Sequence, residues 1–418
     1  MDIFIRQARI VDPSSRFHQQ KVDIFIQNGT IADIGNINHS VERNIDIEGL
    51  CVSPGWLDPF AHFCDPGFEF RETLETGASA AAAGGYTDVM ILPNTNPCLH
   101  NKSGIEYIVQ RSKSLPVTVH PIAAITKNNE GKELAEMYDM QQSGAIAFSD
   151  GISTVQSSGL MVKALQYIKA IGKTIIQVPD DKSVSGPGLV NEGVVSTRLG
   201  LPGKAAIAEE LMVSRDIELA AYTASRLHIT GISSERSLRL IREAKASGTD
   251  VTCSVTPYHL CFSDEDLAGY DTNLKVNPPL RTKKDQQALK EGLMDGTIDC
   301  IATHHLPHNA DNKMVEFEYA QYGMTGLETS FAVVRSCCPE LSEGRIVDLF
   351  CTNPRKIFGL QPASIAKNNR AALTLFLTDA KWTVQKFRSK SKNSPFAGKQ
   401  LVGRPVGIIN KDNLFLNE

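Results

Sequence analysis

The chain has 418 residues, of which 42% are hydrophobic and 22% charged, and its formal net charge is −4 at pH 7. This weakly acidic balance provides no electrostatic footprint for nucleic acid or for an anionic membrane surface, so we expect neither as a partner. The length is sufficient for one large domain with a smaller domain attached to it.

The cysteine pattern and the N-terminal residues predict a cytoplasmic protein. The first 13 residues carry charges inside their apolar run and lack a small-residue cleavage site, unlike a signal peptide. No uncharged apolar run reaches the ~18 residues that a membrane-spanning helix needs. The nine cysteines are scattered and odd in number, so they match neither a disulfide framework nor a Cys-x-x-Cys zinc module.

Both ends of the chain have the pattern of short strands, which predicts one small β-domain built from residues 1–53 and 364–418. Apolar and polar residues alternate in these segments, with turns at Asp12-Pro13 and Asn28-Gly29. The expected strands include Ile3–Ile5, Val22–Gln27, Ala372–Leu377 and Val406–Ile409.

Residues 54–363 alternate strand and helix patterns, which predicts an α/β fold, a parallel (β/α)8 barrel. A doubly wound open sheet is the alternative, but it explains the long loops after the strands and the β-rich ends less well. The expected helices include 73–83, 155–170, 205–225 and 234–246. The expected strands are Gly55–Phe60, Thr87–Leu92, Val117–Ile122, Ala145–Ser149, Thr174–Val178, Arg226–Thr230, Asp250–Val255 and Asp299–Ala302.

The first of these strands ends in Asp58-Pro59-Phe60-Ala61-His62. An Asp-x-His-x-His strand end places two imidazoles on one face of a strand, because side chains alternate with period two, and this is a metallohydrolase arrangement. Here Phe60 stands where the first imidazole belongs. The metal-binding pair is therefore broken.

Several motifs in order give the chain a family resemblance over nearly its whole length. The chain resembles the dihydroorotases of the amidohydrolase superfamily, in particular the bacterial class related to the dihydroorotase part of multifunctional pyrimidine enzymes. The resemblance implies a (β/α)8 barrel with a small β-domain from both termini. The motifs are Ile10-Val11-Asp12-Pro13, Asp65-Pro66-Gly67, Gly323-Met324-Thr325-Gly326-Leu327-Glu328-Thr329, Asn353-Pro354-Arg355-Lys356-Ile357-Phe358-Gly359 and Ser389-Lys390-Ser391-Lys392-Asn393-Ser394-Pro395-Phe396.

The resemblance also implies where the zinc site of the family would lie, and most of its residues are replaced. The family positions for the first-strand zinc ligands are Phe60 and His62, and Cys64 replaces the arginine that binds the substrate carboxylate. Asn94 and Asn277 match residues that contact substrate. The remaining positions fall on Asp150 (a doubtful metal ligand of strand four), Val178 and Gly231 (histidine ligands of strands five and six) and His304 (the general-base aspartate of strand eight).

These losses argue against ordinary dihydroorotase chemistry. A catalytic zinc takes about three protein ligands and lowers the pKa of bound water from about 15.7 toward ~7. His304, with an unperturbed pKa of ~6.5, is able to accept a proton near neutral pH, but it would face a water that no metal activates. We expect Phe60 and Val178 to fill the old metal cavity with apolar groups. We therefore expect that the protein binds no cofactor, or that it binds zinc if it is active.

Several residues retain two interpretations. His62 is either a remnant ligand or a hydrogen-bonded histidine in a residual pocket, and His62, Cys64 and His304 together form a hypothetical new zinc site. Cys64 is either a nucleophile with His304 as its base or a buried thiol. Asn94 and Asn277 either contact a ligand or cap turns beside prolines. His305 and His308 are interpreted as a solvated or structural pair.

Two functional hypotheses follow. The first is a non-catalytic dihydroorotase-like protein, for which the resemblance implies aspartate transcarbamoylase as partner and a homodimer as assembly. The second is an active zinc-dependent cyclic amidohydrolase that uses an altered site to convert dihydroorotate and water to N-carbamoyl-aspartate. Stoichiometric metal discriminates between them.

Overall fold

The middle of the chain forms a (β/α)8 barrel in the computed structural model, which describes residues 2–37, 41 and 43–417. Its strands are parallel and pair in chain order, which confirms the predicted fold and excludes a doubly wound sheet, whose strand order reverses. The strands are β6 (Trp56–Ala61), β7 (Tyr86–Ile91), β8 (Thr118–Ala123), β9 (Ala147–Phe148), β10 (Ile175–Gln177), β13 (Leu227–Thr230), β14 (Val251–Val255) and β15 (Cys300–Ile301).

The barrel closes between its first and last strands through one carboxylate and a short backbone bridge. Asp58 on β6 accepts hydrogen bonds from the Thr303 amide (2.8 Å) and the Thr303 hydroxyl (2.7 Å). Beyond them the His62 amide donates to the His305 carbonyl (2.8 Å). Burial raises the pKa of Asp58 to about 6. The carboxylate thus joins the two strands that the sheet ladder leaves unpaired.

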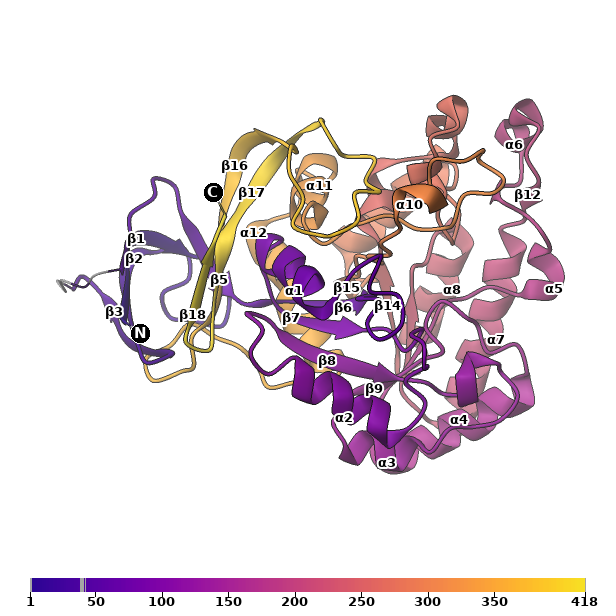
Figure 1. Ribbon diagram of the computed structural model, residues 1–418, viewed down its shortest axis with the longest axis horizontal. Coiled ribbons are helices and arrows are strands. Elements are labelled where there is room, and N and C mark those ends of the chain that lie inside the picture. Colours follow the sequence, from indigo (N-terminus) through magenta and orange to yellow (C-terminus); the bar gives the residue numbers. More distant parts are fainter. Residues whose placement is uncertain (1, 38–40, 42, 418) are drawn as a thin grey trace.

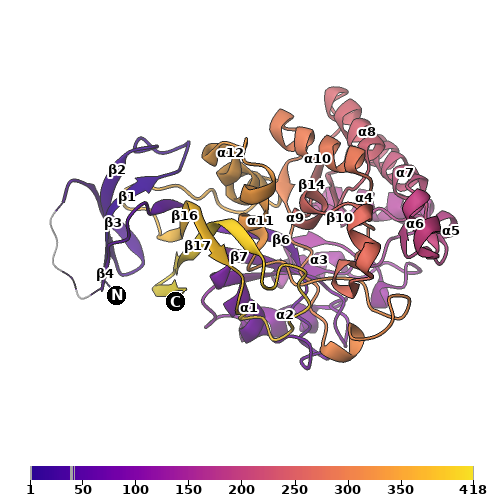
Figure 2. The same ribbon diagram turned by 90° about the horizontal axis from the view of Figure 1, so that it is seen from above.

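Helices follow most barrel strands and cover the outside of the barrel (Figures 1 and 2). Several begin at side-chain caps, as when Thr73 accepts from the Thr76 amide and Ser234 from the Ser237 amide. No helix in the described ranges is long and apolar enough to cross a membrane. The helices are α1 (Leu74–Ala83), α2 (Lys102–Arg111), α3 (Met137–Gln142), α4 (Ser158–Ile171), α5 (Lys182–Ser185), α6 (Val194–Leu199), α7 (Ile207–Thr223), α8 (Glu235–Ala246), α9 (Pro257–Cys261), α10 (Lys283–Asp295), α11 (Ser330–Cys337), α12 (Glu343–Val347) and α13 (Asn353–Ile357).

Both ends of the chain contribute to a second sheet, which lies at one end of the molecule in Figures 1 and 2. Strand β5 joins the two ends, because it pairs in parallel with β1 and antiparallel with β16. The strands are β1 (Asp2–Ile10), β2 (Lys21–Gln27), β3 (Thr30–Gly35), β4 (Arg43–Ile45), β5 (Cys51–Pro54), β16 (Ala372–Thr383), β17 (Gln400–Asn410) and β18 (Asn413–Leu416). A separate two-stranded ladder, β11 (Val190–Asn191) with β12 (Gly203–Lys204), lies in the segment after β10.

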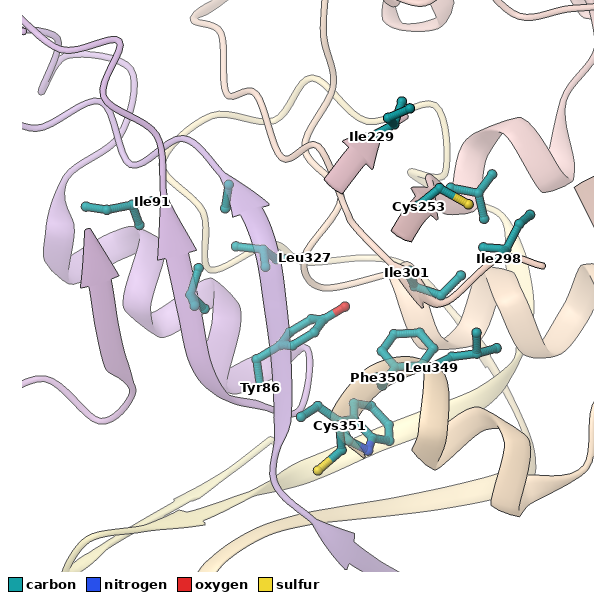
Figure 3. Close-up of a cluster of buried hydrophobic side chains, with 14 of the residues drawn as sticks. Tyr86, Ile91, Ile229, Cys253, Ile298, Ile301, Leu327, Leu349, Phe350 and Cys351 are labelled. Carbon is teal, nitrogen blue, oxygen red and sulfur yellow. The ribbon is translucent and has the colours of Figure 1, made fainter. Parts of the chain in front are cut away.

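An aromatic cluster joins the barrel to the small β-domain. Trp56, which is fully buried at the start of β6, lies 4.9 Å from Phe331, 5.2 Å from Phe350 and 5.4 Å from Phe376 between ring centroids. Phe376 belongs to β16 of the small sheet. Figure 3 shows the neighbouring part of this core, where Tyr86 and Phe350 approach each other. Both domains therefore share one continuous apolar contact.

The contacts of Asp58 predict strong coupling across the barrel closure. We expect Asp58→Ala to lower the free energy of unfolding by roughly 2–3 kcal/mol and Thr303→Val by about 1 kcal/mol, because both remove hydrogen bonds to a buried carboxylate. In urea denaturation the double variant should show about 1 kcal/mol of coupling.

Thr223→Val is the matched control, since Thr223 is also buried but donates to the Leu219 carbonyl in α7. It should be additive with Asp58→Ala. If the losses of unfolding free energy caused by Thr303→Val and Asp58→Ala were also additive, the role of Asp58 at the closure would be contradicted.

Candidate active site

Phe60 and His304 stack on each other where β6 and β15 end. Their ring centroids are 4.4 Å apart at an interplanar angle of 32°. The two side chains are 1% and 2% exposed, so little water reaches them. Phe60 also belongs to one apolar cluster with Val178. Two positions that the resemblance assigns to zinc ligands are thus filled by hydrocarbon, as expected from the sequence.

Gly231 leaves the space that the His304 ring occupies. A Cβ atom on Gly231 would lie 2.6 Å from Cε1 of His304, closer than carbon atoms pack, and the φ of Gly231 is +71°. The imidazole is held there by Thr230, whose hydroxyl lies 2.8 Å from Nε2. The two positions that the resemblance assigns to strands six and eight are therefore coupled, because the His304 ring occupies the volume that a side chain at 231 would need.

The expectation that His304 titrates near neutral pH is wrong for this arrangement. Burial, together with the smaller effects of the neighbouring His259 and His228, lowers the pKa of His304 to about 3. A neutral imidazole with this pKa is a weak base at pH 7. On sequence grounds, His304 is the candidate base that deprotonates water or Cys64. Because the buried ring accepts a proton so weakly, it is poorly suited to either role.

His62 has both ring nitrogens engaged. The Cys64 amide donates to Nδ1 (2.9 Å), so the remaining proton lies on Nε2, which donates to the Asn94 carbonyl (2.9 Å). Burial lowers the pKa of His62 to about 4, which keeps the ring neutral. These contacts favour the hydrogen-bonded histidine over the remnant ligand.

Cys64 lies beside the same ring as a buried thiol. Its Sγ atom is 3.0 Å from Nδ1 of His62, and burial raises the pKa of the thiol to about 12. A thiol is a poor nucleophile and a poor metal ligand. The chemistry of a Cys64 nucleophile is therefore not supported by its surroundings.

The residues present do not fit a zinc ion as they are arranged. Among the described residues, no group of three or more His, Cys, Asp or Glu side chains is placed to hold a metal. His62 and Cys64 bond to each other, whereas His304 bonds to Thr230 and packs on Phe60. The hypothetical zinc site of these three residues would require all of them to leave their present partners.

Asp150 and His228 are also committed to structural contacts. Asp150 accepts from the amides of Ile125 and Thr126, both at 2.9 Å, and so holds the loop after β8. His228 lies 2.9 Å from the Thr252 hydroxyl through Nδ1 and 3.1 Å from the Ser254 hydroxyl through Nε2. Neither side chain is directed to a metal.

Asn94 ties two loops together rather than ending free in the site. Its Nδ2 donates to the Asp150 carbonyl (3.0 Å) and its Oδ1 accepts from the Ile152 amide (3.1 Å). These bonds use both ends of the amide, which favours the structural interpretation of this residue.

Asn277 belongs to a polar network that sequence patterns did not predict. Its Oδ1 accepts from Nζ of Lys204 (2.6 Å), which also donates to Asp180 (2.8 Å). Burial alone would raise the pKa of Asp180, but Lys204 holds it below the usual value. Lys204 is on β12 and lies 24 residues after Asp180 in the chain. The intervening segment has no helix or strand periodicity, so the sequence spacing did not indicate this contact.

His305 and His308 are structural, and the solvated alternative is wrong because both are buried. Nδ1 of His305 accepts from the Gly326 amide (3.2 Å), and Nε2 lies 3.5 Å from a carboxylate oxygen of Glu72. Nε2 of His308 donates to the Tyr322 carbonyl (2.9 Å). They anchor the loop that follows β15.

Comparisons with known proteins agree with the motifs. A family model described as dihydro-orotase-like matches residues 49–237. A dihydroorotase of Pelotomaculum thermopropionicum is 44% identical over 415 residues, covering 98% of this chain and 97% of that protein. A dihydroorotase of Syntrophus aciditrophicus is 40% identical and covers 100% of both chains. The chain belongs to the dihydroorotase family.

Solved structures confirm the amidohydrolase type of fold. The L-hydantoinase (dihydropyrimidinase) of Arthrobacter aurescens superposes with a TM-score of 0.88 at 24% identity, covering 100% of this chain and 96% of that one. The dihydropyrimidinase of Brevibacillus agri gives 0.85 at 20% identity, covering 100% and 95%. This dihydroorotase family member thus has the same fold over its whole length.

Because the pKa of His304 is lowered in the folded protein, we expect the free energy of unfolding to decrease as the pH falls. Its folded pKa of about 3 lies below the ~6.5 of the unfolded chain, so only the unfolded state takes up this proton as the pH falls below 6.5. Between pH 7 and 5, the free energy of unfolding of the unmodified protein should fall by about 2 kcal/mol more than that of His304→Gln. Parallel curves of unfolding free energy against pH would contradict the burial of a neutral His304.

The coupling of Gly231 and His304 predicts a strongly non-additive pair. Gly231→His should lower the free energy of unfolding by about 3 kcal/mol or more, because the new side chain overlaps the His304 ring and adopts positive φ. Adding His304→Asp should recover roughly half of this loss, since it empties the contested volume. An equal loss in single and double variants, measured by thermal or urea denaturation, would show that His304 is not the obstacle.

Proposed function

We propose that this dihydroorotase family member is non-catalytic and acts in pyrimidine biosynthesis as a structural partner of aspartate transcarbamoylase. The non-catalytic role is supported by the stack of Phe60 on His304. By the resemblance, these two residues stand at the positions of a zinc ligand and of the general base, and here they pack on each other. A hydrolase that lacks the metal has no group to polarise the amide carbonyl or to activate water.

The loss of the substrate anchor supports the same proposal. Cys64, a buried neutral thiol, stands where the family carries an arginine. An arginine-carboxylate pair contributes roughly 1.5–3 kcal/mol, and a thiol supplies no comparable contact to a carboxylate. Substrate binding and chemistry would therefore be weakened together.

The alternative is an active zinc-dependent dihydroorotase that uses an altered site. It is supported by the names of relatives at 40–44% identity over nearly the whole chain. It requires His62 to leave the Asn94 carbonyl and His304 to leave Phe60, so that at least these side chains face a metal. We favour the non-catalytic function because the first move removes the hydrogen bond to the buried Asn94 carbonyl, and the second breaks a buried ring contact and the bond of His304 to Thr230.

The partner half of the proposal rests on the family resemblance and on the retained scaffold. A barrel that keeps its closure, its aromatic junction and its loop anchors while replacing its metal positions retains what an assembly needs. A homodimer, common in the family, is proposed as the unit that associates.

We predict no dihydroorotase turnover and no stoichiometric metal in the purified protein. The measurement is elemental analysis together with an assay of dihydroorotate and N-carbamoyl-aspartate in both directions. The Pelotomaculum thermopropionicum relative, purified and assayed in parallel, is the matched control. Turnover accompanied by about one metal ion or more per chain would overturn the non-catalytic proposal.

The partner is tested separately by co-expression with the aspartate transcarbamoylase of the same organism. A complex that survives size-exclusion chromatography supports the assembly role. Separate elution of the two proteins at micromolar concentration, with full transcarbamoylase activity, would contradict it.

A further inference from the structure

A cleft of about 730 Å³ lies beside β16 and β17 of the small β-domain. These two strands run side by side in Figure 1, where the chain leaves β16 and returns as β17. Its volume is within the ~300–1,000 Å³ range of small-molecule sites. The walls come from the ends of these two strands, residues 384–388 and Asn417. These elements differ from those that build the barrel site.

The cleft is positively charged although the whole chain is not. Lys381, Lys386, Arg388 and Arg404 line it. The segment 380–411 contains eight Lys and Arg residues and no Asp or Glu, against a formal net charge of −4 for the chain. Such a local excess within a concave surface concentrates anions.

Glu328 is the one acid among the described residues that line the cleft. Glu328 accepts hydrogen bonds from the backbone amides of Arg388 (2.8 Å) and Ser389 (3.1 Å). Its carboxylate is therefore used to fix the loop, and burial raises its pKa. The lining cations gain no ion pair from it.

Two of the lysines are available to a ligand. In the described part of the chain, the side chains of Lys381 and Lys386 have no hydrogen bond or ion pair, and both are exposed. By contrast, the neighbouring Lys390 donates to the Glu69 carbonyl and Lys392 to the Phe387 carbonyl. Of these four lysines, the two without a partner are thus those that line the cleft.

The same cleft has an aromatic wall. Trp382 and Phe387 line it, and both are half-buried. Nε1 of Trp382 donates to the Gly403 carbonyl (2.8 Å), which fixes the indole. A fixed aromatic ring beside cations suits a planar group that carries phosphates, because stacking and charge act together.

We propose that this cleft binds a phosphorylated small molecule with a planar ring, of the nucleoside diphosphate or triphosphate class. Its phosphates lie on Lys381 and Lys386, and its ring lies against Trp382. The site is additional to the barrel site, and its occupancy does not depend on whether the barrel is catalytic.

In the experiment, the full chain is titrated separately with ATP, UTP and inorganic pyrophosphate. Binding is measured by calorimetry and by tryptophan fluorescence. The chain has two tryptophans, and Trp56 is fully buried, so a fluorescence change reports on Trp382. We expect saturable binding, a fluorescence change that Trp382→Phe abolishes, and weaker binding of pyrophosphate than of the nucleotides. Raising the salt concentration should weaken binding, since exposed charges are screened.

The decisive variant is Lys381→Ala/Lys386→Ala, which should raise the Kd for the nucleotides at least about tenfold. Lys163→Ala/Lys356→Ala is the matched control, because these lysines are also exposed and lie outside the cleft, and its Kd should be unchanged.

Three results would overturn the proposal. They are no saturable signal with any of the three ligands at millimolar concentration, the same Kd for both double variants, and tighter binding of polyglutamate or DNA than of the nucleotides. Because the readout is binding rather than turnover or assembly, each result leaves the proposed function untouched.

Discussion

The contact between the rings of Phe60 and His304 determines what the barrel site is able to hold. Both rings are buried, and their packing requires that position 231 carries no side chain. A dense apolar contact of this kind excludes water, and a metal with its bound water needs the opposite environment. Positions 60, 231 and 304 are thus parts of one packed region.

The other polar side chains of the site form hydrogen bonds that connect the surrounding loops. His62 joins its own loop to the loop after β7, and Asp150 holds the loop after β8. Lys204 and Asp180 form a buried pair beside Asn277. Each of these groups has a protein partner, although Oδ1 of Asp180 is buried without one.

The scaffold and the candidate site depend on different residues. The interactions that close the barrel and join it to the small β-domain use Asp58, Thr303 and Trp56, which lie outside the replaced positions. The resemblance over the whole chain to relatives named dihydroorotase is a property of the scaffold and does not by itself establish turnover.

The sequence predicted the scaffold well, because periodicity and ordered motifs are local properties. All eight barrel strands overlap the expected ranges, and β16 and β17 lie in the expected terminal segment. The site was predicted in part: Phe60 and Val178 were expected to be apolar filling, but the lowered pKa of His304 depends on packing from several strands. The contacts of Lys204 and of Glu328 join residues far apart in the chain, and no spacing rule reveals them.

The position of zinc in a crystal grown with an excess of that ion tests the central claim most directly. An anomalous difference map at the zinc absorption edge should show no peak within about 2.0–2.3 Å of His62, Cys64 or His304. Phe60 and His304 should remain stacked in the same crystal. A peak bonded to two or more of these three side chains, with the stack broken, would contradict the account.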